Sequence, residues 1–315
     1  MKWSYSKAKT FNHCQRKWYY AEIMAQWNAK EPLRKEVYLL KQLRSIHAWR
    51  GNIVDTVIHK MIIPRMVKGK LPSEQETIRY ATALAERQLD FGKRNRHREP
   101  GMTQTKGGDN YCAFFDVEYK NGLNEMQVEK AKQEINAALS TLLCSPLLVE
   151  IKRNASKIIP QRNLIIPAND FNVTSRPDLI VFYDNRPPLI VDWKVHEGRN
   201  TDYWLQLGIY AYVLAQTKPH VDFPVAFIEA KYSAHDYAVT EFQLLKGLTK
   251  EYRLSVEDIL DIEDYIHSTG SIMKSFVEED DKFDVRHYAS TRYPGMCASC
   301  EFGKVCWEAE TNVEH

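Results

Sequence analysis

The sequence predicts an α/β fold in which a small mixed sheet is flanked by helices. Two short apolar runs, Leu179–Tyr183 and Leu189–Val195, flank a turn-forming segment at 184–188, and this pattern predicts an antiparallel hairpin. Around the hairpin the expected order is helix, three strands, helix and strand. Strands and helices that alternate in this way favour one sheet with helices packed against it.

The composition is that of an ordinary globular chain. The 315 residues are 44% hydrophobic and 27% charged, and we expect a single domain over 1–315. The net charge of +2 does not by itself predict a nucleic-acid partner, so any basic surface must be local. The start of the chain is polar, and no apolar stretch approaches about 18 residues, so we expect a cytoplasmic protein without a membrane partner.

The first half of the chain is predicted to be helical. One helix begins at a cap near Ser4 or Ser6 and runs to about Ala25, with its aromatic side chains at helical spacing. A second helix covers Trp49–Val67, and its apolar residues also recur at helical spacing. Residues 68–150 are predicted to form a helical insertion.

The second half is predicted to contain the sheet core, at residues 151–245. Apolar and β-branched runs mark the strands, and a longer apolar period marks the helices. Besides the hairpin, the patterns predict strands at Ile158–Ile166, Asn172–Tyr183, Phe223–Tyr232 and Tyr237–Leu244, and helices at Thr201–Gln216 and Ser255–Ser268.

Acidic residues lie in the hairpin where a buried strand would not favour them. Asp178 precedes the first strand, Asp192 lies inside the second, and Lys194 follows two residues later. Because strand side chains alternate between faces, Asp192 and Lys194 share one face. An ionised acid inside a strand is costly unless it is paired or metal-bound. A metal site with a positioned water fits this pattern; the alternative is a strand-end cap and a lone buried salt bridge.

Three of the six cysteines lie close together near the end of the chain, as Cys297-x2-Cys300-x5-Cys306. Such spacing in a cytosolic protein predicts a metal site rather than disulfides. Zinc and a [4Fe-4S] cluster are both compatible with the spacing alone. Cys14, far away in the sequence, is the candidate fourth ligand.

A set of short motifs resembles the PD-(D/E)xK nuclease superfamily. The motifs are His59, Pro177-Asp178, Asp192-Trp193-Lys194 and Gln206-x3-Tyr210. Within that superfamily the chain is most similar to the RecB-like branch that includes Cas4 and the nuclease domains of AddB and Dna2. The one-plus-three cysteine arrangement resembles the iron-sulfur staple of those nucleases and favours a [4Fe-4S] cluster over Zn²⁺.

The resemblance implies a restriction-endonuclease-like fold and assigns roles to the motif residues. The cluster would join residues 1–30 to 285–315, two ends that we expect to share little core. Mg²⁺ or Mn²⁺ would be held by His59, Asp178, Asp192 and the backbone carbonyl of Trp193. Lys194 would orient or deprotonate the attacking water, and Gln206 and Tyr210 would orient the lysine and contact the phosphate.

The sequence therefore predicts a metal-dependent DNA nuclease. We expect a single-strand exonuclease or end-processing enzyme in DNA recombination, repair or CRISPR adaptation. The alternative is a catalytically inactive DNA-binding subunit. No Walker A sequence is present, so a helicase, recombinase or integrase partner would be another chain.

Candidate DNA contacts are scattered along the chain. Positions 91–109 interrupt the helical insertion with a basic cluster, which is either a solvated loop or a mobile loop that contacts phosphates. No helix-turn-helix or zinc-finger pattern indicates reading of a duplex sequence. The predicted DNA-binding residues are Lys17, Arg94, Arg96, Arg98 and Tyr210.

Overall fold

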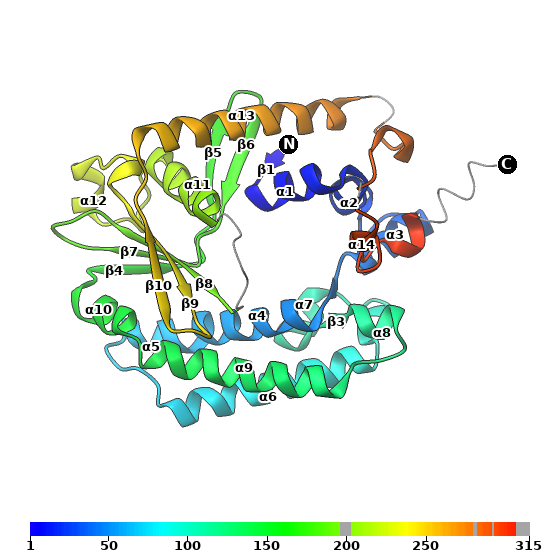
Figure 1. The fold of residues 1–315 in the computed structure, drawn as a ribbon, viewed down its shortest axis with the longest axis horizontal. Coiled ribbons are helices and arrows are strands. Elements are labelled where there is room, and N and C mark those ends of the chain that lie inside the picture. Colours follow the sequence, from blue (N-terminus) through cyan, green and yellow to red (C-terminus); the bar gives the residue numbers. More distant parts are fainter. Residues whose placement is uncertain (196–202, 280–281, 292, 307–315) are drawn as a thin grey trace.

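A five-stranded mixed sheet lies at the centre of the fold, with helices on both faces (Figure 1). The computed structural model describes residues 1–195, 203–279, 282–291 and 293–306. In the sheet, β8 and β9 are parallel and the other neighbours are antiparallel, as predicted for a mixed sheet. The strand order is β10 (Leu248–Tyr252), β9 (Ala238–Gln243), β8 (Leu189–Lys194), β7 (Leu179–Phe182) and β4 (Lys157–Pro160).

The hairpin strands β7 and β8 are buried on both faces. On one face, Ile180 and Ile190 belong to a core that includes α11 and α13. On the other face, Val181 and Val191 belong to a core that includes α4, α6 and α9. Burial on both sides explains why these strands read as continuous apolar runs. The covering helices are α4 (Ile46–Val57), α6 (Glu74–Lys93), α9 (Glu125–Leu143), α11 (Tyr203–Gln216) and α13 (Val256–Glu278).

Two of the predicted strands are each broken and shared between two sheets. The run 158–166 breaks at Gln161, whose φ of 46° is left-handed, and the run 172–183 breaks at 176–178, where Pro177 cannot donate a ladder hydrogen bond. The backbone N–H of Gln161 donates to the carbonyl of Asp178 at 3.0 Å, so the two breaks are adjacent. The second sheet has the order β1 (Lys2–Trp3), β6 (Phe171–Ser175) and β5 (Leu164–Ala168).

The N-terminal helix is interrupted at Cys14. Ser4 caps its first segment, with the side chain accepting from the backbone N–H of Lys7 at 3.4 Å, as predicted. Cys14 is extended, and its sulfur accepts from the backbone N–H of Lys17 at 3.4 Å, which starts a new helix. The prediction of one continuous helix is therefore wrong. The segments are α1 (Tyr5–His13), α2 (Gln15–Tyr19) and the π-helical η1 (Tyr20–Met24).

The segment predicted as the strand Phe223–Tyr232 is instead the helix α12 (Val225–Ala230). The aromatic residues of this segment favoured a strand in the prediction. In the structure, Phe223 and Phe227 are four residues apart, which is helical spacing, and both contact Phe182, with ring centroids 5.6 and 4.8 Å away. Conversely, β10 was not predicted, because its residues are mostly exposed and polar at the edge of the sheet.

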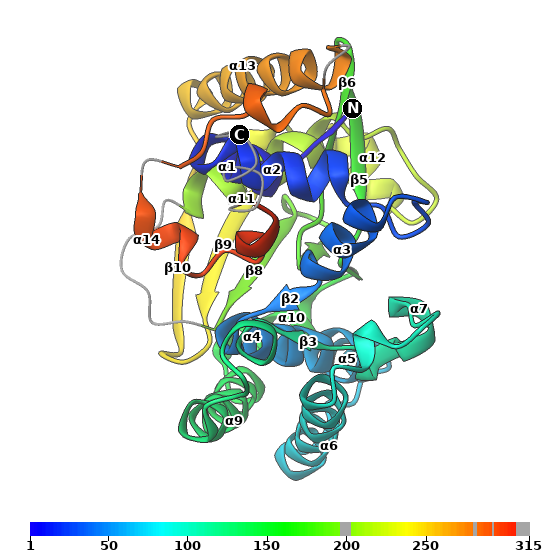
Figure 2. The same ribbon diagram turned by 90° about the vertical axis from the view of Figure 1, so that its right-hand side faces the viewer.

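The region predicted as a helical insertion, 68–150, is largely helical. There α6 begins with a reciprocal cap between Ser73 and Glu76 and packs with α9 and α4 below the sheet (Figure 2). Among the described residues no single helix is long and apolar enough to cross a membrane. The bent pair of α9 and α10 (Pro146–Asn154) reaches that length and apolar composition only when the two helices are taken together. The start of the helix expected at Thr201 and the segment 307–315 lie outside the described residues.

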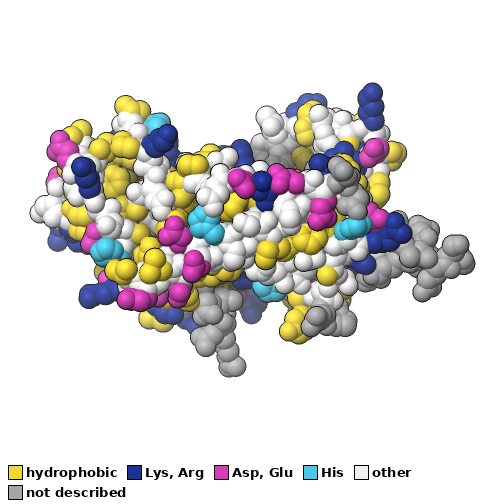
Figure 3. All heavy atoms as spheres, turned by 90° about the horizontal axis from the view of Figure 1, so that it is seen from above, with side chains coloured by type: hydrophobic (Ala, Val, Ile, Leu, Met, Phe, Trp, Pro, Cys, Tyr) yellow, Lys and Arg dark blue, Asp and Glu magenta, His cyan; other side chains and the backbone are white. Residues whose placement is uncertain are grey.

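On the face over α13, acidic and basic side chains are interspersed with hydrophobic ones (Figure 3), in keeping with a net charge near zero.

The shorter elements complete the chain. These elements are α3 (Pro32–Leu40), β2 (Leu43–Arg44), η2 (Ile58–Ile62), α5 (Ile63–Val67), η3 (Arg96–Arg98), α7 (Gln104–Gly107), η4 (Gly108–Asn110), β3 (Ala113–Phe114), α8 (Phe115–Tyr119), α10 (Pro146–Asn154), η5 (Ala234–Asp236), η6 (Val285–His287) and α14 (Pro294–Cys297).

Candidate active site

A cavity of about 530 Å³ gathers three acids and a lysine. Asp55 comes from the third turn of α4, Asp178 from the residue before β7, and Asp192 and Lys194 from β8. Residues far apart in the sequence thus line one space at the carboxyl end of β8.

The hairpin positions its charged side chains as strand alternation predicts. The carboxylate of Asp178 accepts from the backbone N–H of Trp193 at 2.9 Å, which ties the two strands together at the site. Lys194 forms an ion pair with Asp192 on the same face. The Trp193 side chain points the other way and packs on Phe242 in the opposite core.

Burial and repulsion by neighbouring carboxylates raise the free energy of the ionised forms of Asp178 and Asp192. Burial raises the pKa of Asp178 well above its ordinary value, and the nearby carboxylates of Asp192 and Asp55 raise it further. Asp192 is only 3% exposed, and burial raises its pKa despite the ion pair with Lys194. Burial opposes the charge of Lys194, but Asp192 and Asp178 outweigh it and raise the pKa of that ammonium. Among the described residues, Lys194 and Arg50 are the lysine and arginine that line the cavity, and Arg50 is paired with Glu134 and with the carbonyl of Val195. The three acids therefore exceed the cationic charge that faces them, and a further cation would stabilise them.

Gln206 and Tyr210, predicted on one face of the following helix, reach the same cavity. The side-chain oxygen of Gln206 accepts from the ammonium of Lys194 at 3.4 Å, and its amide nitrogen donates to the Tyr210 hydroxyl at 2.6 Å. Gln206 therefore links the lysine to the tyrosine.

His59 does not line the cavity; Asp55, one turn earlier on the same helix, does. His59 belongs to the π-helical η2, whose wider turn rotates the residues after Val57 relative to a regular α-helix. Burial raises the pKa of Asp55, while the hydrogen bond from Gln161 and the nearby His59 act in the opposite direction. The structure therefore places Asp55, and not His59, among the residues that line this cavity. The missed signal was Asp55 itself, four residues after Gly51 on the helix that faces the hairpin.

Gln161 is a second residue that the sequence did not predict. From its left-handed position it donates through its side-chain amide to Asp55 at 2.6 Å, and it accepts from Arg176 through its side-chain oxygen. Gln161, a left-handed non-glycine residue, thus connects Asp55 and Arg176 to the backbone carbonyl of Asp178 by hydrogen bonds.

The donor set at this cavity suits a hard divalent ion. Carboxylate oxygens are the ligands that Mg²⁺ and Mn²⁺ prefer. As placed, no three His, Cys, Asp or Glu side chains of the described residues form a group that could hold a metal ion. The fit therefore depends on chemistry: three carboxylates line one cavity, and burial and neighbouring acids raise the pKa of two of them.

The four predicted cluster cysteines also line one cavity, of about 140 Å³. All six cysteines lie in the described ranges, and none forms a disulfide. Burial raises the pKa of the Cys300 thiol to about 11. The four thiols match a thiolate-bound metal centre in identity and number. In their present positions, however, the cysteines of the described residues do not form a group that could hold a metal ion.

The two ends of the chain share more core than predicted. Tyr20 stacks on Phe302 with ring centroids 5.6 Å apart, and Tyr19 packs on Tyr288 at 4.5 Å. Lys17 forms an ion pair with Glu301 at 2.8 Å. Residues of α2 and α14 accordingly line one cavity, and the two helices are close in the view of Figure 1. The expectation that little core joins the ends is wrong.

The predicted DNA-contacting arginines are already paired. Arg98 donates to Glu36 at 2.7 and 2.9 Å and to Glu118 at 2.9 Å, so it links α3 to α8. Arg96 pairs with Glu99 at 3.1 Å, and Arg94 with Asp90 at 2.8 Å. Arg98 is therefore a structural link between α3 and α8. Arg94 and Arg96 are more exposed, and their ion pairs can exchange.

Comparison with known proteins gives a family match over almost the whole chain. A family model described as the PD-(D/E)XK nuclease superfamily matches residues 2–307. Among solved structures, the chain is similar to the crystal structure of SSO0001, with 14% sequence identity and a TM-score of 0.32 over 72% of this chain and 95% of that chain. A search of curated proteins found no match.

Proposed function

The chain belongs to the PD-(D/E)XK nuclease superfamily, and on that premise we propose that it is a metal-dependent deoxyribonuclease that hydrolyses phosphodiester bonds. The observation that carries the proposal is the single cavity that brings Asp55, Asp178 and Asp192 together with Lys194. An acid cluster around one lysine is the arrangement that phosphodiester hydrolysis needs.

In this proposal the three carboxylates and the backbone carbonyl of Trp193 hold Mg²⁺ or Mn²⁺. The ion would neutralise the phosphate and lower the pKa of a water nucleophile. Asp178 also anchors the second strand through the Trp193 N–H, which fixes the position of that carbonyl.

Lys194 acts as a charged donor. Since neighbouring carboxylates raise its pKa, its ammonium stays protonated and can orient the attacking water and stabilise charge that builds on the phosphate. Gln206 fixes the direction of this ammonium, and Tyr210 extends the hydrogen-bonded chain.

We further propose that the four cysteines hold a [4Fe-4S] cluster, with zinc as the alternative metal. Support comes from the shared cavity and from the one-plus-three spacing of the thiols. The substrate would be single-stranded DNA or DNA with free ends, and a helicase, recombinase or integrase would act as a separate chain.

The test is digestion of end-labelled DNA by protein purified without oxygen. Linear and circular single strands and a blunt duplex are compared with Mg²⁺, with Mn²⁺ and with chelator. We expect cleavage of the linear single strand only in the presence of metal, and survival of the circle. Binding without cleavage under every metal condition would overturn the nuclease proposal in favour of a DNA-binding subunit.

A paired substitution separates Asp55 from His59. We expect Asp55→Asn to lower kcat/KM more than about 100-fold, because even outer-shell partners of a metal ligand are worth about 10- to 100-fold. His59→Ala is expected to stay within a fewfold of wild type, because His59 does not line the cavity. The reverse order of effects would restore the histidine as the ligand.

A further inference from the structure

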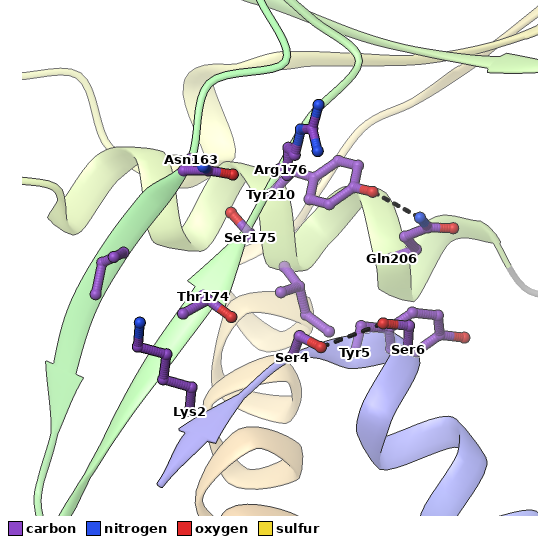
Figure 4. A pocket seen from close by; sticks show the side chains of 12 residues that line it. Lys2, Ser4, Tyr5, Ser6, Asn163, Thr174, Ser175, Arg176, Gln206 and Tyr210 are labelled. Carbon is purple, nitrogen blue, oxygen red and sulfur yellow. Dashed lines mark hydrogen bonds between the residues drawn. The ribbon is translucent and has the colours of Figure 1, made fainter. Parts of the chain in front are cut away.

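A second groove adjoins the active site. Its volume is about 480 Å³, and it shares Gln206 and Tyr210 with the active-site cavity. The end of β6, the start of α1 and one side of α11 form its walls (Figure 4). A molecule in this groove would therefore lie in direct continuity with the acids and the lysine.

The lining of the groove favours an anion. Its two charged residues are Lys2 and Arg176, and no Asp or Glu occurs among the described residues that line it. In Figure 4 these two side chains stand at opposite ends of the groove, with Thr174 and Ser175 between them. Hydroxyl and amide groups supply most of the remaining polar surface, and such groups bind phosphate oxygens without reading bases.

The N-terminus of α1 opens onto the same groove. Ser4, Tyr5 and Ser6 line it, and they are the cap and the first two residues of this nine-residue helix. The first turn contains no acidic residue. The positive end of the helix dipole and its N–H groups therefore face the groove, which is the usual backbone site for a phosphate.

A buried hydroxyl gives an independent indication of a ligand. Ser175 is 8% exposed, and its Oγ has no hydrogen-bond partner among the described residues. A buried hydroxyl without a partner is costly. Since Ser175 lines the groove between the two cations, a phosphate oxygen bound there would be the missing partner.

We propose that this groove binds the sugar-phosphate backbone of one DNA strand next to the bond that is cut. The inference rests on the proposed nuclease function and extends it to the path of the substrate. A single strand is the occupant, because the groove is lined by groups that bind the sugar-phosphate backbone and continues into the acid cavity. Lys2, Arg176 and the α1 N-terminus would contact successive phosphates.

The test is Ser6→Glu, which places an acid in the groove at the second residue of α1. An acid in the first turn favours the helix, so the variant should unfold at or above the wild-type temperature. Met126→Glu is the matched control: it adds the same charge at the second residue of α9, on the other face of the sheet, where Met126 is 80% exposed. Lys2→Ala is a second, smaller perturbation of the groove.

Binding of a labelled single-stranded oligonucleotide is measured by anisotropy with chelator, so that no cleavage occurs. We expect Ser6→Glu to weaken binding about tenfold, as for the loss of one charge-assisted hydrogen bond, while Met126→Glu binds like wild type. A plot of the logarithm of the binding constant against the logarithm of the salt concentration has a negative slope. Lys2→Ala should make this slope shallower by about 0.7, because one phosphate contact is lost. With metal, Ser6→Glu should raise KM more than it lowers kcat.

The outcomes separate the groove from the active site. If wild type cleaves DNA and Ser6→Glu binds and cleaves like Met126→Glu, the groove proposal is wrong and the nuclease proposal stands. If wild type binds DNA without cleaving it, the nuclease proposal fails, and the groove is judged on the binding series alone. Equal salt slopes for wild type and Lys2→Ala would also count against the groove.

Discussion

Replacing Asp178 by Asn is expected to abolish DNA cleavage and to stabilise the metal-free protein. Asn can still accept the hydrogen bond from the Trp193 N–H, so the hairpin should keep its geometry. The substitution removes one buried carboxylate, whose pKa burial raises and the carboxylates of Asp192 and Asp55 raise further. We expect cleavage to fall at least about 1,000-fold and the free energy of unfolding to rise by about 1 to 2 kcal/mol at neutral pH.

If Asp178→Asn stabilises the protein because it removes a buried carboxylate, the gain in the free energy of unfolding should depend on pH. The pKa of Asp178 is raised in the folded state, so its ionisation costs stability at neutral pH and costs nothing once the pH is below the unfolded-state value of about 4. The advantage of Asp178→Asn should therefore shrink as the pH falls toward that value. Chemical denaturation from pH 7 downward measures it.

Asp184→Asn is the matched control, since Asp184 is exposed in the turn of the same hairpin. It should change neither cleavage nor stability. Wild-type cleavage by Asp178→Asn would show that the catalytic acids lie elsewhere. A loss of stability in that variant would instead show that Asp178 stabilises the fold and that repulsion among the acids is minor.

Replacing Cys300 by Ser is expected to remove the cluster and to loosen the C-terminal part of the fold. Iron and sulfide content and visible absorbance should be lost, because a serine hydroxyl is a poor substitute for a thiolate ligand. Since aromatic packing also joins the two ends, we expect a fall in Tm of roughly 5 °C or more rather than global unfolding. Cleavage per folded molecule should largely survive.

Hydrogen exchange locates this effect. Faster exchange is expected at 293–306 and around Cys14, with little change in β7 and β8. Cys144→Ser is the control, because Cys144 is an exposed cysteine away from the thiol cavity. A colourless wild-type protein with one bound zinc would replace the iron-sulfur assignment by a structural zinc site, and unchanged metal content in Cys300→Ser would exclude Cys300 as a ligand.

Local periodicity was enough to predict the hairpin of β7 and β8. Strand alternation places Asp192 and Lys194 on one face wherever the strand lies, and the structure pairs them. The i,i+4 spacing of Gln206 and Tyr210 likewise survives folding, because helix geometry alone sets it. The mixed sheet followed from the order of the apolar runs.

Only the tertiary structure determined which residue supplies the third acid, where the predicted strands break and which residues pair with the arginines. Which residue of α4 faces the hairpin depends on the rotation of the helix and on the π-helical turn at His59, so the sequence spacing did not distinguish His59 from Asp55. Arg98 could not be assigned because its partners are Glu36 and Glu118, which only the folded chain brings to it. Local spacing thus determined pairs within one element, whereas packing between elements determined the rest of the site.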